Sequence, residues 1–242
     1  MSNPVLLRVD GEVAHVLLNR PQARNAITIE LAAALRDTLT AAAQRARVIV
    51  IRGADGTFCA GGDRAEVARL REQGAAALRP LFETFIGACE LIARLPVPVV
   101  AAVEGAAVAG GFELVQSVDI AIVRDDAVLA DNHANAGMIP GGGGSQRLPR
   151  LVGVPRALGH ILTGDRLTGA EAAAWGVVYR SVPAAGFEDA VAALVANLAG
   201  KDRAALARIK QLVRTGMAGS LTDGLAMEVE ATLAHLTEEG EP

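Results

Sequence analysis

The chain has 242 residues, enough for one sizeable domain with an ample hydrophobic core. Its net charge of −4 and its short basic clusters, such as residues 45–47, argue against nucleic acid as the main partner. Cys59 and Cys89 are too few for a disulfide framework or a metal site, and neither a signal peptide nor an apolar run of about 18 residues is present. We therefore expect a soluble cytoplasmic protein that binds no metal and no membrane.

The first quarter of the sequence predicts a hairpin, a helix and a buried strand. Residues 6–9 and 13–18 alternate apolar and polar side chains around Asp10-Gly11, which is a strong hairpin signal. Thr28 can cap a helix whose Leu31, Leu35 and Leu39 recur at helical spacing. The apolar run 48–51 then predicts a strand that Gly53 ends.

A glycine-rich loop at residues 57–63 comes next, and helical composition follows at residues 64–95. Gly74 and Pro80 interrupt that segment, so we expect two helices there. The apolar, largely β-branched run 97–103 predicts a strand buried on both faces.

The turn after this strand is a candidate site. Gly105, Gly110 and Gly111 let the backbone bend sharply or approach a ligand closely, and a helix follows from Phe112. Free N–H groups at the start of a helix favour an anion or a carbonyl that gains negative charge. Glu113 lies beside that point, which suggests an oxyanion site with a neighbouring carboxylate. On this stretch alone, a tight turn with a glutamate that only complements the helix dipole is the favoured interpretation.

The rest of the chain alternates short strands with glycine-rich loops and then becomes helical. Strands are expected at 119–123, 128–129 and 177–178, and the loop 131–144 carries five glycines and one proline. Helices are expected at residues 155–162, 187–198, 202–215 and 221–236. The capping box Thr168–Glu171 predicts the start of one more helix.

Five stretches together resemble the crotonase family, also called the enoyl-CoA hydratase/isomerase superfamily. They are NRPQARNAI, FCAGGD, VEGAAVAGGFELVQSVDIAI, GMIPGGGGSQRLPRLVG and AAAWGVVYRSV, spanning about residues 19–183. The resemblance implies an α/β fold with a crotonase-like spiral of ββα units over residues 1–183. It also implies a helical C-terminal region over residues 184–242 that forms homotrimers, often paired into hexamers.

The resemblance also implies the roles of individual residues. The backbone N–H groups of Gly62 and Gly110 match the family's oxyanion hole, which binds the thioester oxygen of an acyl-CoA as an enolate forms. Glu113 matches the first of the two glutamates that hydratases use. The second should lie four residues before Gly137, where this chain has His133. Imidazole can accept or donate a proton near neutral pH, so a Glu113/His133 pair is chemically adequate for adding water.

Other interpretations of this loop remain open. A shift of one or two residues would bring Asp131 or Asn132 into the pocket in place of His133, and Asp131 could then act as a nucleophile. His133 could also be a polar filler in a protein without hydratase activity. Isomerases of the family commonly rely on a glutamate at this position, which makes a simple isomerase less attractive.

Substrate recognition follows from the same resemblance. The backbone around Arg24, Ala26, Ala60 and Gly61 matches the family's contacts to coenzyme A, and Arg64 is a candidate for the ribose phosphate. We expect an enoyl-CoA hydratase of fatty-acid or related acyl-CoA metabolism, with coenzyme A as part of the substrate and no other cofactor. The alternatives are an isomerase or other thioester enzyme of the family, and a non-catalytic acyl-CoA binding protein.

Overall fold

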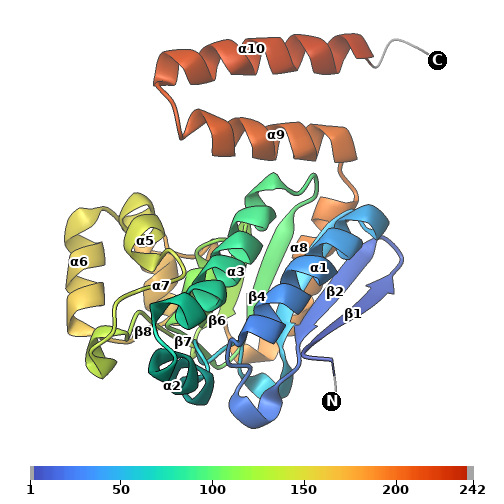
Figure 1. The fold of residues 1–242 in the computed structure, drawn as a ribbon. Coiled ribbons are helices and arrows are strands. Elements are labelled where there is room, and N and C mark those ends of the chain that lie inside the picture. The colour runs from blue at the N-terminus through green and yellow to red at the C-terminus, as the bar shows by residue number, and fades with distance from the viewer. Residues whose placement is uncertain (1–2, 239–242) are drawn as a thin grey trace.

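The chain begins with the hairpin that Asp10-Gly11 predicts. In the computed structural model, which describes residues 3–238, β1 (Val5–Asp10) pairs antiparallel with β2 (Val13–Leu18). Gly11 takes a φ of +55°, a left-handed conformation that glycine adopts without steric cost. The two strands form one edge of the main sheet (Figure 1).

The main sheet has six strands in the order β1-β2-β3-β4-β6-β9, and every pair after the hairpin is parallel. Parallel neighbours require crossover connections, and the intervening helices supply most of them. The further strands are β3 (Val48–Gly53), β4 (Val99–Val103), β6 (Ile120–Arg124) and β9 (Arg180–Val182).

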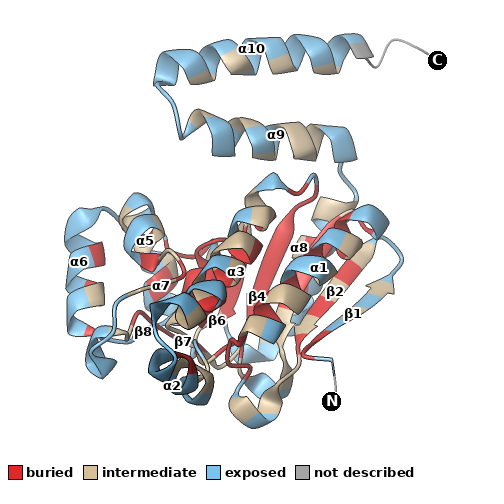
Figure 2. Cartoon of the chain, viewed as in Figure 1, coloured by how far each residue is buried: buried red, intermediate tan, exposed pale blue. Residues whose placement is uncertain are grey.

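Helices cover both faces of this sheet, and side chains along its strands alternate between them. Ile49 and Ile51 of β3 face the core that includes α1 (Ile29–Arg45) and α3 (Ala75–Arg94). Val48 and Val50 face the opposite core beneath α8 (Phe187–Ala199). Because both faces are covered, the central strands are continuous apolar runs, and Figure 2 shows them buried.

A second, smaller sheet lies beside the first and was only partly predicted. It joins β5 (Ala106–Val108) to β7 (Val128–Ala130) in parallel, and β7 to the short β8 (Leu167–Thr168) in antiparallel orientation. Each of β4 and β6 therefore continues, after a bend, into a strand of the second sheet. This repeated strand–strand–helix unit is the ββα spiral that the sequence predicts.

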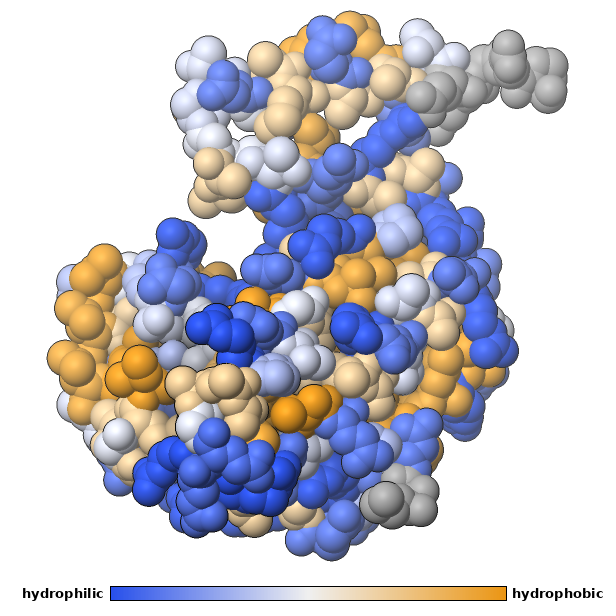
Figure 3. All heavy atoms as spheres, in the orientation of Figure 1, coloured by the Kyte–Doolittle hydropathy of each residue, from blue (hydrophilic) through white to orange (hydrophobic). Residues whose placement is uncertain are grey.

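The remaining helices surround the two sheets or extend from them. They are α2 (Arg64–Glu72), α4 (Gly110–Val115), α5 (Gly144–Val152), α6 (Val154–Thr163), α7 (Gly169–Trp175), α9 (Arg203–Gly216) and α10 (Leu221–Glu238). Short 3-10 helices occupy Pro21–Ala23, Ala54–Gly56, Ala134–Ala136 and Ala184–Gly186. Helices α9 and α10 form a hairpin that projects from the body, and Figure 3 shows apolar atoms along α10. Among the described helices, none combines the length and apolar character of a membrane span.

The predicted caps are confirmed. The Thr28 hydroxyl accepts a hydrogen bond from Leu31 N, and Thr168 and Glu171 form the reciprocal capping box. The carboxylate of Asp202 likewise caps α9. Such caps depend on residues three apart in sequence, which is why sequence alone predicts them.

Two local predictions were wrong. The strand expected at 177–178 is a buried bend, and β9 begins at Arg180 instead. The two helices expected over residues 64–95 are present as α2 and α3, but Pro80 lies inside α3 and only Gly74, whose φ is +92°, separates the two. The domain boundary at residues 183/184 stays a prediction, and residues 1–2 and 239–242 of the two expected regions lie outside the described part.

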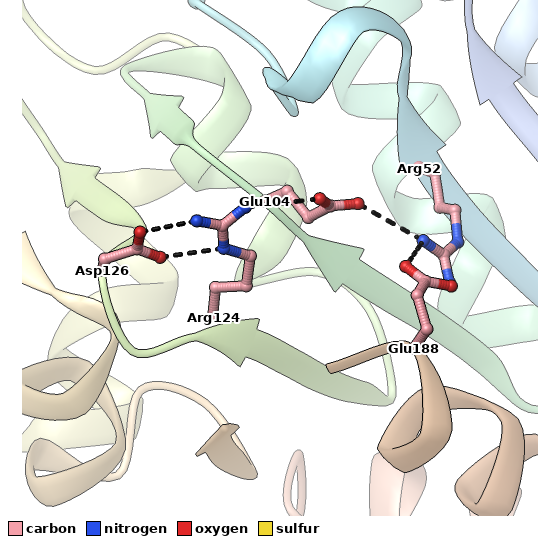
Figure 4. Close-up of polar contacts among 5 residues, drawn as sticks. All are labelled: Arg52, Glu104, Arg124, Asp126 and Glu188. Atoms are coloured by element: carbon pink, nitrogen blue, oxygen red, sulfur yellow. Dashed lines mark hydrogen bonds and ion pairs between the residues drawn. The ribbon is translucent and has the colours of Figure 1, made fainter. Parts of the chain in front are cut away.

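Charged side chains at the ends of the central strands form a network of ion pairs (Figure 4). Glu104, directly after β4, contacts Arg52 of β3 at 3.4 Å and Arg124 of β6 at 3.6 Å. Arg52 also forms a bidentate pair with Glu188 of α8, and Arg124 forms one with Asp126. The network therefore links three parallel strands and the helix that covers them.

Candidate functional site

A cavity of about 380 Å³ lies where the two glycine-rich loops, α2, α3 and the loop 131–144 meet. Its walls combine apolar side chains with a few polar groups, as ligand sites usually do. The polar and glycine residues at its wall include Gly62, Arg64, Gly110, Glu113, Asn132 and His133. Its apolar side is formed mainly by Val67, Leu81, Phe82, Phe85, Met138 and Ile139.

The two glycine loops converge at this cavity, as the resemblance implies. A Cβ placed on Gly61 would lie 3.3 Å from Gly110 N, so the two backbones are almost in contact. Bridges from Ile27 to Gly62 and from Cys59 to Ala107 hold the loops in register. Among the hydrogen bonds of the described residues, none uses the N–H of Gly62 or of Gly110 as its donor. Both N–H groups are thus left for a ligand at the cavity wall.

Ala109 holds the second of these N–H groups in place through an unusual backbone conformation. Its φ of 49° and ψ of −120° are costly for a residue with a Cβ, by roughly 1–3 kcal/mol. Ala109 N donates to Ala130 O, and Ala109 O accepts from Glu113 N, so β7 and α4 both fix the strained peptide. Such strain is typical of binding and catalytic sites.

Glu113 lies in the first turn of α4 with only 2% of its surface exposed. Its Oε1 accepts two hydrogen bonds of 2.8 Å, from the N–H groups of Gly142 and Gly144. Burial raises the pKa of Glu113 above its usual value, although these N–H groups and the neighbouring His133 act in the opposite direction. Oε2 is left facing His133 and the cavity.

His133 faces Glu113 across the cavity wall. Its Nε2 lies 4.0 Å from Glu113 Oε2, and its Nδ1 lies 2.6 Å from Asp131 Oδ1. Burial opposes a charge on the ring, but the hydrogen bond to Asp131 and the charges of Asp131 and Glu113 outweigh it, so the pKa of His133 is raised. His133 can therefore carry a proton near neutral pH, next to a carboxylate that burial makes more basic.

The register of the loop places His133 and Asn132 at the cavity wall, whereas Asp131 lies beneath them. Asp131 is completely buried and does not line the cavity. A nucleophilic Asp131 is therefore incompatible with this geometry. The Asp131 N–H donates to Nε2 of the buried His160, a contact 29 residues apart that sequence spacing does not reveal.

The residues predicted for coenzyme A lie at or beside the same cavity. Ala60 and Arg64 line it directly. Arg24 and Gly61 take positive φ, and the carbonyl oxygens of both accept hydrogen bonds that join their loops, from Ala60 N and Ile27 N respectively. Ala26 is buried behind the wall.

Sequence reasoning missed the residue that anchors the first of these loops. The buried Asn25 accepts from Arg20 N through Oδ1 and donates through Nδ2 to the carbonyl oxygens of Ala54 and Thr57. In the sequence, the only nearby indication of this role is that the polar Asn25 is followed by apolar residues. The three partners become visible only in the folded chain.

Comparisons with known proteins agree with one another. The family model described as enoyl-CoA hydratase/isomerase matches residues 8–240. A protein of Rhodobacter capsulatus named a probable enoyl-CoA hydratase is 35% identical over 220 residues, covering 89% of this chain and 83% of that one. The enoyl-CoA hydratase structure from Bacillus anthracis has a TM-score of 0.89 at 32% identity, over 95% of this chain and 89% of that one. A Thermobifida fusca YX protein solved in complex with acetoacetyl-CoA has a TM-score of 0.88 at 33% identity, over 98% and 96% of the two chains.

Proposed function

Because this chain belongs to the enoyl-CoA hydratase/isomerase family, also called the crotonase family, we propose that it is an enoyl-CoA hydratase. It adds water across the 2,3-double bond of an enoyl-CoA thioester. The observation that carries the proposal is the placement of Glu113 and His133, 4.0 Å apart, in one cavity with the N–H groups of Gly62 and Gly110. An acid–base pair beside two convergent donors is what hydration of a conjugated thioester requires.

The two N–H groups bind the thioester oxygen and stabilise the negative charge that develops on it. Removing one such donor costs about 3–4 kcal/mol in other enzymes. The strained Ala109 and the paired loops hold both donors before substrate arrives, so little reorganisation is needed at the moment of reaction. Since these donors polarise the carbonyl, the proposed reaction needs no resident metal or redox cofactor.

Glu113 Oε2 accepts a proton from water as the water oxygen attacks the β-carbon. Its Oε1 is held by Gly142 and Gly144, which leaves one oxygen with a defined direction for this task. Its raised pKa makes Glu113 a stronger base than an exposed carboxylate. His133 then supplies a proton to the α-carbon.

The substrate is an acyl-CoA whose acyl group lies against Phe82 and Phe85 of α3 and against Met138. The relatives solved with coenzyme A or acetoacetyl-CoA support this substrate class. The proposal also includes a homotrimer or hexamer in the cytoplasm, which light scattering and cell fractionation can test.

The test is the absorbance of the conjugated enoyl thioester of crotonyl-CoA on addition of the purified protein. We expect the absorbance to fall for the wild type and to fall about 10²–10⁴ times more slowly for H133A. Identification of 3-hydroxybutyryl-CoA by mass spectrometry separates hydration from isomerisation. Absorbance that stays constant while crotonyl-CoA binds would instead favour a non-catalytic binding protein.

A further inference from the structure

The carboxylate beneath His133 has no part in the proposed reaction, yet its Oδ1 lies 2.6 Å from the ring nitrogen Nδ1. We propose that Asp131 is a positioning residue: it accepts the Nδ1 proton of His133 and so directs Nε2 at the α-carbon as the proton donor. This inference rests on the proposed hydration, whereas the position of the ring proton that it assigns can be measured without turnover.

The geometry fixes which nitrogen does which task. A carboxylate can only accept, so the 2.6 Å contact between Asp131 Oδ1 and His133 Nδ1 requires the proton on Nδ1. Nε2 then faces Glu113 Oε2 and the cavity. In the imidazolium form, Nε2 carries the transferable proton and Nδ1 keeps its own.

Asp131 is itself held rigidly. Its N–H donates at 3.0 Å to His160 Nε2, and the His160 ring packs edge-on against Phe112 and Trp175, with centroids at 5.5 and 6.0 Å. Burial lowers the pKa of His160, which keeps that ring neutral and able to accept. His160 therefore anchors the backbone from which the Asp131 carboxylate projects.

The Asp131 carboxylate also lacks the partners that would neutralise it. Its Oδ2 is buried without a hydrogen-bond partner among the described residues. Gly144 leaves it room, since a Cβ there would lie 2.8 Å from Oδ2. A buried carboxylate with one ring as its main polar partner favours a positively charged form of that ring.

Other charged groups around His133 do not compete for Asp131. Glu113 of α4 faces the opposite ring nitrogen. Arg147 of α5 donates to Gly142 O, and Arg64 and Arg71 of α2 line the cavity, but none of the three forms an ion pair with Asp131 in the described part of the chain.

Every proton transferred in one catalytic cycle has a donor and an acceptor among water, the substrate, Glu113 and His133. Water gives a proton to Glu113 and its hydroxyl to the β-carbon, and the electron pair moves to the thioester oxygen. The enolate then takes the Nε2 proton of His133 at the α-carbon, which leaves a neutral ring with Nδ1–H still bound to Asp131. Protonated Glu113 returns its proton to Nε2 across the 4.0 Å gap, directly or through one water, and restores the starting state.

The experiment compares wild type, D131N and the control D126N, which makes the same change at an exposed ion pair with Arg124. For D131N we expect kcat for crotonyl-CoA hydration to fall about 100-fold with KM within threefold. The alkaline limb of the kcat profile should move to lower pH, because the group that favours the His133 imidazolium is gone. D126N should match the wild type in both.

Nuclear magnetic resonance of ¹⁵N-labelled histidine gives a readout independent of turnover. The chain has four histidines, so H133Q identifies the His133 signals by difference. We expect wild type to show a protonated Nδ1 with a strongly downfield proton that D131N loses.

D131N with unchanged kcat and pH profile overturns the inference, and so does a wild-type His133 with its neutral-form proton on Nε2. A wild type without hydratase activity but with the expected Nδ1–H signal overturns the proposed function and leaves the assignment of the ring proton standing.

Discussion

Two clusters of charged side chains in this protein contain the same kind of group, the carboxylates of Glu and Asp, but in opposite surroundings. In the network of Figure 4, Glu104 lies between Arg52 and Arg124 and is partly exposed. At the cavity, Glu113 and Asp131 are buried, and a histidine takes the place of the arginines.

The difference is one of proton mobility. A guanidinium stays charged at any accessible pH, so the charges of Arg52 and Arg124 are fixed and their cluster serves to join strands. An imidazole gains and loses its proton near neutral pH, so the charge of the cavity cluster can move during a reaction. The burial that makes the cavity cluster costly for folding also makes its side chains reactive.

The largest expected effect comes from removing the proton acceptor. E113Q keeps an oxygen for the N–H groups of Gly142 and Gly144 but cannot take a proton from water, so kcat should fall about 10³-fold. A hydration assay with crotonyl-CoA measures this, with E83Q of an exposed pair as the control. Activity within tenfold of wild type would exclude Glu113 as the base.

The same variant is expected to be more stable than wild type. The pKa of Glu113 is raised in the folded state, so its contribution to stability is present below its ordinary value of 4.5 and is lost as pH rises through the folded pKa. The glutamine of E113Q does not ionise, so this variant does not lose stability in that way as the pH rises. Its Tm should exceed that of wild type by roughly 2–4 °C at pH 8, and the excess should disappear near pH 4. Calorimetry across this pH range would contradict the expectation if the difference were constant.

A third carboxylate in the cavity cluster should be strongly unfavourable. H133E brings a glutamate against Asp131 and Glu113. We expect its free energy of unfolding to be about 2–3 kcal/mol lower than that of H133Q. Adding D131N removes one of the three charges and should recover more than half of that loss. Urea unfolding at pH 8 measures both, and additive effects of H133E and D131N would contradict the coupling.

The packing of the glycine loop against α3 gives a smaller effect. A Cβ on Gly142 would lie 2.4 Å from Phe85 Cε1 and 2.6 Å from Glu113 Oε2, so G142A should cost about 1–3 kcal/mol and lower kcat. The matched control is G87A in the same helix as Phe85, where a Cβ meets nothing within 4 Å. Helix propensity predicts that G87A gains about 0.5–1 kcal/mol. Equal melting temperatures for the two variants would refute the close contact.

The smallest effect is expected in the network of fixed charges. E104Q leaves Arg52 and Arg124 with their outer partners, Glu188 and Asp126, and should cost about 0.5–1 kcal/mol without altering the pH dependence of activity. The cost should shrink in 1 M salt, because the network is partly exposed. Urea unfolding at two salt concentrations tests this.

Several parts of the molecule follow from residues close together in sequence. The turn at Asp10-Gly11 and the caps at Thr28 and Thr168 depend on contacts within four residues, and the buried strands are continuous apolar runs. The ordered motifs also identified the family. Neighbouring residues carry this information because their geometry is fixed by one or two turns of backbone.

Only the folded chain decided how the site is completed. Residues 131–144 have no periodicity from which side-chain direction could be read, so Asp131, Asn132 and His133 were alternatives until β7 and α6 fixed the loop. His160, 29 residues away, holds Asp131, and Gly142 and Gly144 hold Glu113 across a similar separation. Such contacts depend on where the sheets and helices bring loops together, and burial of the resulting cluster sets its proton affinities; neither is encoded in local spacing.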